Sequence, residues 1–205
     1  MGIIRMKIQA LDWTMGEVAN VFVGLKGGEC MIDWGDGHTS VFQAHPREVY
    51  PQYESHVYPC KCKTSGDIFD VVITSTEDNI VFLNTGCIDM TIIELDLSQC
   101  PELERLDLTR PVKSLDLSHN QALEQLQIKG YDNPRLDISR CDNLWYLDCG
   151  NSEIKEIVVS NQSALKDIIF LYHCPLDVNL KSFNFIRATL DRNNGSITIL
   201  YEDQP

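Results

Sequence analysis

The stretch LDLSQCPELERLDL, residues 95–108, is the first of four copies of one pattern along this chain, with changing spacer residues. The later copies begin at residues 115, 136 and 157 and read LDLSHNQALEQLQI, LDISRCDNLWYLDC and IVVSNQSALKDIIF. Their starts advance by 20, 21 and 21 residues, while the two apolar triplets within each copy stay eleven residues apart. A fixed period of this size predicts a β-solenoid, in which each copy adds one turn.

Each triplet has the pattern of a short strand with one buried face. The outer two residues of a triplet point to one side and the middle residue to the other, because side chains alternate along a strand. A unit of about 20 residues cannot bury that face alone, so we expect copies to stack about 4.8 Å apart into a continuous apolar column. Small polar or thiol side chains in the turn are expected to satisfy backbone groups inside the coil or to fill it. These are Cys100, Asn120, Cys141 and Gln162.

The second triplet of each copy resembles the leucine-rich repeat family, whose unit runs Leu-x-x-Leu-x-Leu before a turn residue. The segment Leu144-Trp145-Tyr146-Leu147-Asp148-Cys149-Gly150-Asn151 carries the resemblance most fully, and the resemblance covers about residues 80 to 180. It departs from the family at Pro111, Tyr131 and His173, which replace the asparagine-type turn residue. The resemblance implies a leucine-rich repeat solenoid over residues 80–205 with about four to five repeats, closed by capping strands near 183–190 and 196–201.

Residues 1–79 have a different pattern, with short β-rich runs between glycine, proline and polar clusters. The Asp33-Trp34-Gly35-Asp36-Gly37 segment predicts a tight turn, because Asp-Gly supplies a positive φ. It resembles the Trp-Gly-Asp-Gly signature of PKD-like domains, which implies a small immunoglobulin-like β-sandwich. Two hypotheses stand for Asp33 and Asp36: a calcium site built from carboxylate oxygens, or side chains that cap their own turn.

Composition favours a mainly β protein with two modest domains, 1–79 and 80–205. The chain has 205 residues, 43% of them hydrophobic, and a formal net charge of −13. This acidity disfavours nucleic acid as a partner. No stretch approaches 18 consecutive apolar residues, so no transmembrane segment is expected. The N-terminus lacks the pattern of a secretory signal, which predicts a cytoplasmic protein if the chain is complete and a surface or secreted one if a leader was trimmed.

The eight cysteines are interpreted mainly as buried, reduced thiols. Cys100 and Cys141 lie two repeats apart, about 10 Å on strand stacking, which is too far for a disulfide. One group offers zinc ligands: His45, His56, Cys60 and Cys62. Structural zinc sites usually space paired cysteines by about two to four residues, so the Cys-x-Cys spacing favours a loop with incidental thiols over a metal site. No cofactor is therefore predicted.

No catalytic motif stands out in the sequence. There is no Gly-x-Ser-x-Gly, phosphate loop or dinucleotide fingerprint, and the chain is predicted not to be an enzyme. Asp96, Asp116 and Asp137 are expected to stack in a column as solvated or turn-bonded residues copied with the repeat. His119 and His173 are interpreted as surface histidines.

The second strand series is the predicted binding face, because its outward residues vary and include arginine and aromatic side chains, which dominate contact energies. The predicted face comprises Arg105, Asp107, Gln125, Gln127, Tyr146, Asp148 and Asp167, with Tyr131, Trp145 and Tyr172 as accessory residues. We expect a protein partner; a glycan ligand is the alternative, since tryptophan and tyrosine stack on sugar rings. A small zinc protein is a third, weaker hypothesis. The oligomeric state is left open.

Overall fold

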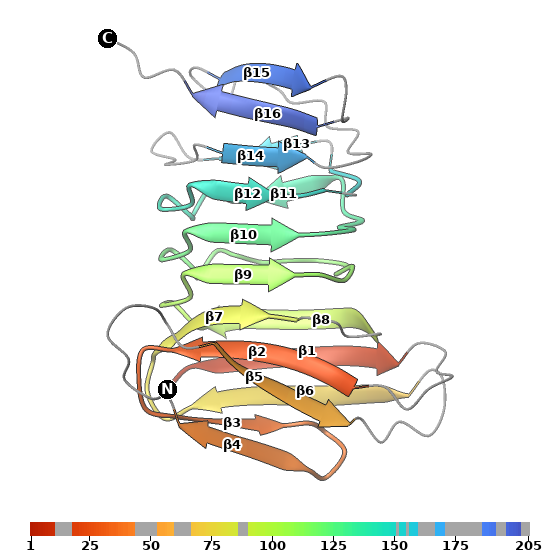
Figure 1. The fold of residues 1–205 in the computed structure, drawn as a ribbon, viewed down its shortest axis with the longest axis vertical. Coiled ribbons are helices and arrows are strands. Elements are labelled where there is room, and N and C mark those ends of the chain that lie inside the picture. Colours follow the sequence, from red (N-terminus) through yellow and green to blue (C-terminus); the bar gives the residue numbers. More distant parts are fainter. Residues whose placement is uncertain are drawn as a thin grey trace.

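The computed structural model describes residues 1–10, 18–43, 53–59, 67–85, 90–150, 152–154, 156–159, 167–170, 186–191 and 196–201. Over these ranges the protein is mainly β, with no helix. Its strands stack along one long axis, from β4 at one end to the β15–β16 pair at the other (Figure 1). The predicted mainly β class is confirmed, and so is a solenoid-like region of about three turns.

Five strands form an antiparallel sheet at the end of the molecule that holds the N-terminal half of the chain. In spatial order they are β4 (Thr39–Gln43), β3 (Glu29–Asp33), β6 (Ile68–Ser75), β1 (Ile3–Ala10) and β8 (Met90–Gln99). Along β1, β3 and β6 buried side chains alternate with more exposed ones, as expected of a sheet with one face on the core.

A second sheet of nine strands runs the length of the molecule. In spatial order it consists of β15 (Ile186–Asp191), β16 (Ser196–Tyr201), β14 (Asp167–Phe170), β12 (Tyr146–Asp148), β10 (Gln125–Ile128), β9 (Arg105–Leu108), β7 (Ile80–Asn84), β2 (Val18–Leu25) and β5 (Tyr53–Pro59). The strands from β7 to β14 are parallel. A short parallel pair, β11 (Arg135–Asp137) and β13 (Glu156–Val158), forms a third sheet.

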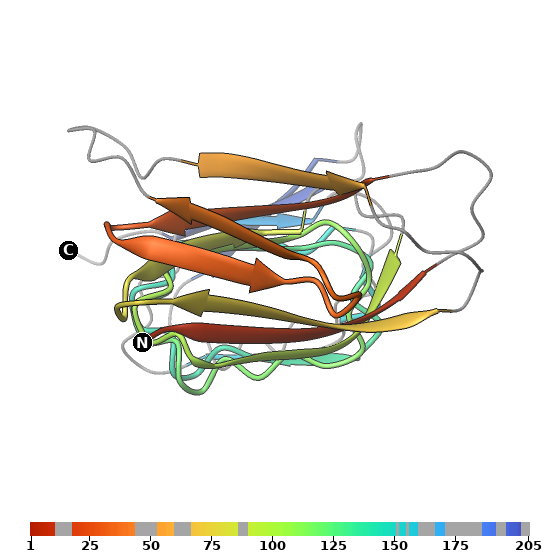
Figure 2. The ribbon, with the colours of Figure 1, turned by 90° about the horizontal axis from the view of Figure 1, so that it is seen from below.

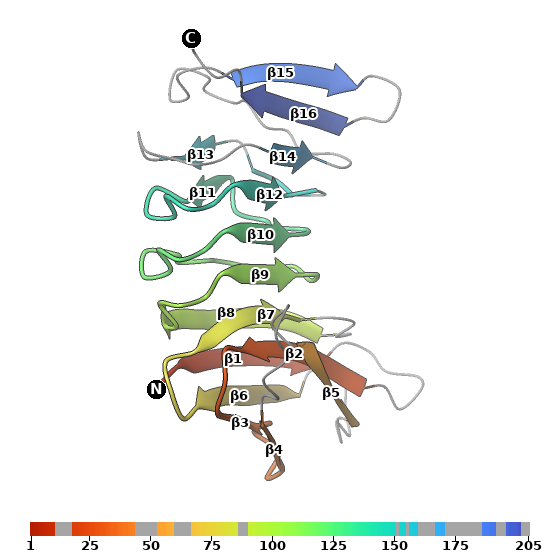
Figure 3. The ribbon, with the colours of Figure 1, turned by 60° about the vertical axis from the view of Figure 1, so that its left-hand side comes forward.

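The second triplets of the repeats stack in the register that their spacing predicts. Leu126 pairs with Leu106 on one side and Leu147 on the other, and Leu147 pairs with Ile168. Seen end-on, the turns superpose as a flattened coil (Figure 2), and from the side the two strand series form separate columns (Figure 3).

The first triplets stack less regularly than predicted. Leu136 pairs with Ile157 between β11 and β13, but residues 115–117 form no strand, and a single bridge joins Ile92 to Val112. Leu117 is nevertheless buried. Apolar packing requires only that side chains alternate, whereas a ladder also requires aligned backbone N–H and C=O groups.

Residues inside the turns bind backbone carbonyls of the preceding turn, as the sequence predicts. The buried Asn120 donates from Nδ2 to the carbonyls of Leu97 (3.1 Å) and Cys100 (2.8 Å). The Cys141 thiol, at the equivalent position, lies 3.8 Å from the Leu117 carbonyl. These contacts join consecutive turns from inside the coil. The buried apolar residues form one continuous hydrophobic core that extends from Ile4 to Ile157 and includes Cys100 and Cys141.

The predicted turn in the N-terminal half is present between β3 and β4. Gly35 and Gly37 have φ values of 75° and 88°, and Trp34 is buried with its Nε1 donating to Ser40 Oγ (2.9 Å). Both large sheets contain strands from each side of residue 79, since β1 pairs with β8 and β2 pairs with β7. The division into domains 1–79 and 80–205 and the PKD-like identity stay predictions.

Both ends of the parallel strand stack are covered by antiparallel strands. β7 pairs in parallel with β9 and antiparallel with β2, and β16 pairs antiparallel with β14. Four cysteines in the described ranges, Cys30, Cys100, Cys141 and Cys149, are buried and form no disulfide. Among the described residues no helix is long and apolar enough to cross a membrane.

Candidate functional site

The outward positions of β7, β9, β10, β12 and β14 form two columns, which we call together the second-series face. The register places Phe82, Arg105, Gln125, Tyr146 and Asp167 in the first column and Asn84, Asp107, Gln127, Asp148 and Ile169 in the second. The structure therefore aligns the predicted binding residues of the four successive strands β9 to β14. The side chains described on this face are those of β7, β9, β10 and β12.

Arg105 is held in place by groups on both sides. Its Nη2 lies 2.7 Å from Asp107 Oδ2, its Nε lies 3.1 Å from both oxygens of that carboxylate, and its guanidinium carbon lies 5.3 Å from the centre of the Phe82 ring. The Arg105 side chain is 40% exposed, whereas that of Asp107 is 4% exposed. A buried carboxylate thus orients a surface guanidinium through charge-assisted hydrogen bonds.

Amide and carboxylate side chains alternate along the second column. Asn84 Nδ2 donates to Asp107 Oδ2 (3.4 Å), and Gln127 Nε2 donates to Asp148 Oδ2 (2.9 Å). The Gly150 backbone N–H donates to the other Asp148 oxygen (3.1 Å). Alternation keeps the two carboxylates two strands apart, about 9.6 Å, which limits their repulsion. As whole residues Asp107 and Asp148 are each 3% exposed, so their carboxylates contact neighbouring side chains and present almost no surface.

Two neighbouring aromatic side chains lie half-buried at the start of β12, two strands along the face from β9. The rings of Trp145 and Tyr146 meet edge to face, with centroids 5.9 Å apart and planes at 62°. Tyr131, expected as a further accessory aromatic, is instead 2% exposed and belongs to the core. Burial raises the pKa of its phenol. The side chain of Asp167 and the whole of Tyr172 lie outside the described part of the chain.

The turns that enter these strands carry acidic side chains. The acidic residues that precede β9, β10 and β12 are Glu102, Glu104, Glu124 and Asp142. The Lys26 ammonium nitrogen lies 3.1 Å from a Glu102 carboxylate oxygen and 2.9 Å from one of Glu104. The hydrogen bond to Glu104 is the largest cause of a raised Lys26 pKa. With a net charge of −13 on the chain, the rim beside the face is acidic.

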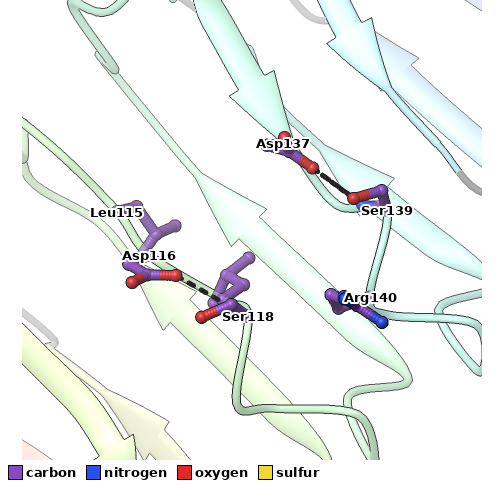
Figure 4. Close-up of a pocket in the computed structure, with 7 residues that line it drawn as sticks. Leu115, Asp116, Ser118, Asp137, Ser139 and Arg140 are labelled. Atoms are coloured by element: carbon purple, nitrogen blue, oxygen red, sulfur yellow. Dashed lines mark hydrogen bonds between the residues drawn. The ribbon is translucent and has the colours of Figure 1, made fainter.

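The first strand series presents its repeated Asp and Ser residues in a different arrangement. Each aspartate accepts the backbone N–H of the serine two residues later, at 2.9 Å for Ser98 and Ser118 and 3.1 Å for Ser139. Figure 4 shows two of these pairs beside Arg140 in a depression of about 330 Å³. These hydrogen bonds lower the pKa of Asp96, Asp116 and Asp137. The carboxylates are turn-bonded, as the sequence predicts.

The residues considered as metal ligands have turn partners or lie outside the description. Asp33 accepts the Gly35 N–H (3.0 Å) and Asp36 accepts the His38 N–H (2.9 Å), which is the capping arrangement. The described residues contain no group of three or more metal-ligating side chains. The backbone of His56 is described in β5, whereas His45, Cys60 and Cys62 lie outside the described residues, so the zinc hypothesis stays a prediction.

Sequence reasoning did not find Phe82 and Asn84 as parts of this face. Both precede the first repeat, and only their pairing with Arg105 and Asp107 reveals their position. The available signal was that Phe82 and Asn84 flank Leu83 in the same way that Arg105 and Asp107 flank Leu106. Comparison with protein-family models, with curated proteins and with solved structures finds no match to this chain.

Proposed function

We propose that this chain is a non-enzymatic binding protein that recognises a protein partner through the second-series face. The observation that supports this most is the Arg105–Asp107 pair, which shares the second-series face with the half-buried Tyr146 two strands away. Burial of the Asp107 carboxylate carries a desolvation cost, which its hydrogen bonds with Arg105 offset, and the pairing holds the partly exposed guanidinium in one orientation. Oriented arginine and aromatic groups are the side chains that contribute most to protein interfaces.

The acidic rim favours a partner whose contacting surface is basic. Opposite charges on two surfaces accelerate encounter and exclude acidic competitors. Asp107 balances the Arg105 charge, and Lys26 pairs with Glu102 and Glu104, so the rim charge beside the face includes the exposed Glu124. Association should therefore weaken as the salt concentration rises.

A pull-down with matched baits tests this proposal. The binding-face variant is Gln125→Ala/Tyr146→Ala, which removes two neighbouring side chains of the first column and changes no charge. The control is Ser114→Ala, which also changes no charge, since Ser114 is exposed outside the second-series face. A basic protein captured by the wild type and the control but lost with the double variant supports the proposal. Equal capture by all three baits overturns it.

A glycan ligand is the second candidate, and the half-buried Trp145–Tyr146 pair is the observation that favours it. Aromatic faces stack on sugar rings, whereas a basic protein would depend on the glutamates as well. Binding to a glycan array that is lost with Tyr146→Ala and insensitive to salt would select this candidate over the protein partner.

The resemblances noted in the sequence extend the proposal. We infer a leucine-rich-repeat-like solenoid of about four to five repeats, including its capping strands, preceded by a PKD-like sandwich. That combination supports a role at a bacterial cell surface. Detection of the native protein in the envelope fraction of its cell would support the location, and its recovery in the cytoplasmic fraction alone would contradict it.

A further inference from the structure

Strand β4 is the terminal strand of the five-stranded sheet and forms one end of the molecule (Figures 1 and 3). Its five residues, Thr39 to Gln43, include no charged residue, proline or glycine. It pairs with β3 in an unbroken register from Glu29–Gln43 to Asp33–Thr39. Edge strands of natural sheets are usually protected by lysine, proline, a bulge or a covering segment. β4 is an uncharged, regular edge strand.

The hydrogen-bond pattern of the hairpin shows which backbone groups face outward. The Trp34 N–H donates to the His38 carbonyl (3.1 Å), and bonded pairs recur at every second position of an antiparallel ladder. Ile32–Ser40 and Cys30–Phe42 are therefore bonded pairs within the hairpin. The N–H and C=O groups of Thr39, Val41 and Gln43 consequently point away from β3, toward the open side of the strand.

An apolar pair lies beside this open edge. Val41 is 57% exposed and Met31, opposite it on β3, is 40% exposed. They are two of the four large hydrophobic residues that are exposed in the described part of the chain, the others being Met1 and Ile68. Adjacent exposed apolar side chains, next to an edge that no strand of the described residues pairs with, indicate an interaction surface.

The opposite edge of the same sheet is protected. β8 carries Glu94 and Asp96, and its pairing with β1 shifts register between Ile3 and Arg5 and between Lys7 and Ile8. A bridge from Ile92 to Val112 also joins β8 to the next segment of the solenoid. Of these two edge strands, only β4 pairs with its neighbour without a register shift.

We propose that two copies of this chain pair through β4, antiparallel and about a two-fold axis at Val41. This register places Val41 opposite Val41 of the second copy and Thr39 opposite its Gln43. The outward groups of these residues then exchange about six backbone hydrogen bonds. The two sheets become one sheet of ten strands, five from each copy, with a row of Met31 and Val41 side chains across the junction.

Charge does not prevent this pairing at physiological salt. On β3, the described strand next to β4, the carboxylates of Glu29 and Asp33 are separated across the two-fold axis by three strand spacings, about 14 Å. The Debye length at about 0.15 M salt is about 8 Å, so their repulsion is screened. Because each chain carries a net charge of −13, dimerisation should strengthen as salt is added. A contact between an acidic rim and a basic partner has the opposite dependence.

Sedimentation velocity of the full chain at low salt and at about 0.15 M salt tests the proposal. We expect twice the monomer mass at the higher salt concentration. Val41→Lys should return the protein to the monomer mass, because two lysines would face each other about 5.5 Å apart. Ile68→Lys is the matched control, since Ile68 is 55% exposed and lies on β6. A monomeric wild type, or a dimer that Val41→Lys leaves intact, overturns the proposal.

Cysteine cross-linking tests the register. Under an added thiol oxidant, Val41→Cys should form a covalent dimer, because residues at the two-fold axis lie within the Cα separation that a disulfide allows. Thr39→Cys should not, because Thr39 faces Gln43 of the second copy and lies about 14 Å from the other Thr39. The wild type under the same oxidant measures any linkage through native cysteines. Equal cross-linking of the wild type and both variants would contradict this register.

Discussion

Gly35 lies against the backbone of Asp70, so closely that a Cβ atom at Gly35 would stand 2.6 Å from the Asp70 carbonyl oxygen. Its φ of 75° also belongs to the left-handed region. Gly37 has a similar φ of 88°, but a Cβ there would meet nothing within 4 Å. The two glycines of the same turn therefore differ in one respect, which is contact with β6.

Replacement of these glycines should separate backbone strain from steric contact. We expect Gly37→Ala to lower the free energy of unfolding by about 1 kcal/mol, because of its left-handed φ alone. Gly35→Ala should cost clearly more, about 2–4 kcal/mol, because β6 must also move. Urea unfolding of both variants measures the difference. Equal losses would show that the approach to Asp70 does not constrain the turn.

Asn120 should be a strong contributor to the stability of the solenoid. Asn120→Ala removes both donors to the Leu97 and Cys100 carbonyls, and we expect a loss of about 2–3 kcal/mol. Asn120→Cys copies the residue at the equivalent positions 100 and 141, so it should cost less. Thermal and urea unfolding rank the stability losses of the two variants. If Asn120→Ala costs less stability than Asn120→Cys, the Leu97 and Cys100 carbonyls do not depend on this side chain.

Asp107 should act on binding through Arg105. Asp107→Asn weakens the hold on the guanidinium, and we expect partner binding to weaken and the free energy of unfolding to fall by about 1–3 kcal/mol. The control is Asp137→Asn, since Asp137 contacts Arg135 at 3.5 Å with both side chains 52% exposed. That exposed pair should contribute less than about 1 kcal/mol. An Asp107→Asn protein that binds normally would remove the positioning role.

Stability should fall in acid partly through the repeated aspartates. Hydrogen bonds from Ser98, Ser118 and Ser139 lower the pKa of Asp96, Asp116 and Asp137 in the folded state. The unfolded value is about 3.9, so this stabilisation is complete above about pH 5 and is lost as the pH falls through the folded pKa values. The urea concentration at the midpoint of unfolding should decline less, as the pH falls below about 5, in the variant that replaces Ser98, Ser118 and Ser139 by alanine. Parallel declines would contradict this cause.

The buried thiols should resist alkylation in the folded protein. Burial is the main cause that raises the pKa of Cys30, Cys100 and Cys141 to about 12, so almost no thiolate is present near neutral pH. Mass spectrometry of peptides after iodoacetamide treatment should show these three residues unmodified in the native protein and modified after unfolding. Native modification of Cys141 would indicate that the solenoid opens at that turn.

The positions of the strands in the second series followed from the sequence, because the spacing of Leu106, Leu126 and Leu147 allows only one stacking register. The first series was less predictable. Leu115 and Leu117 share the apolar alternation of their neighbours, but they form no ladder, since alternation reports side-chain burial and not backbone pairing. Tyr131 shows the same limit, because a turn position does not reveal whether a ring points inward.

The sequence by itself determined the solenoid, its parallel strand stack and the inward turn residues, because each depends on a repeated local pattern that neighbouring copies satisfy together. Only the tertiary structure decided that Phe82 and Asn84 join the second-series face, that Asp107 and Asp148 lie beneath it and that β4 ends its sheet. Those features arise from contacts between segments far apart in the chain, and no periodic pattern records them.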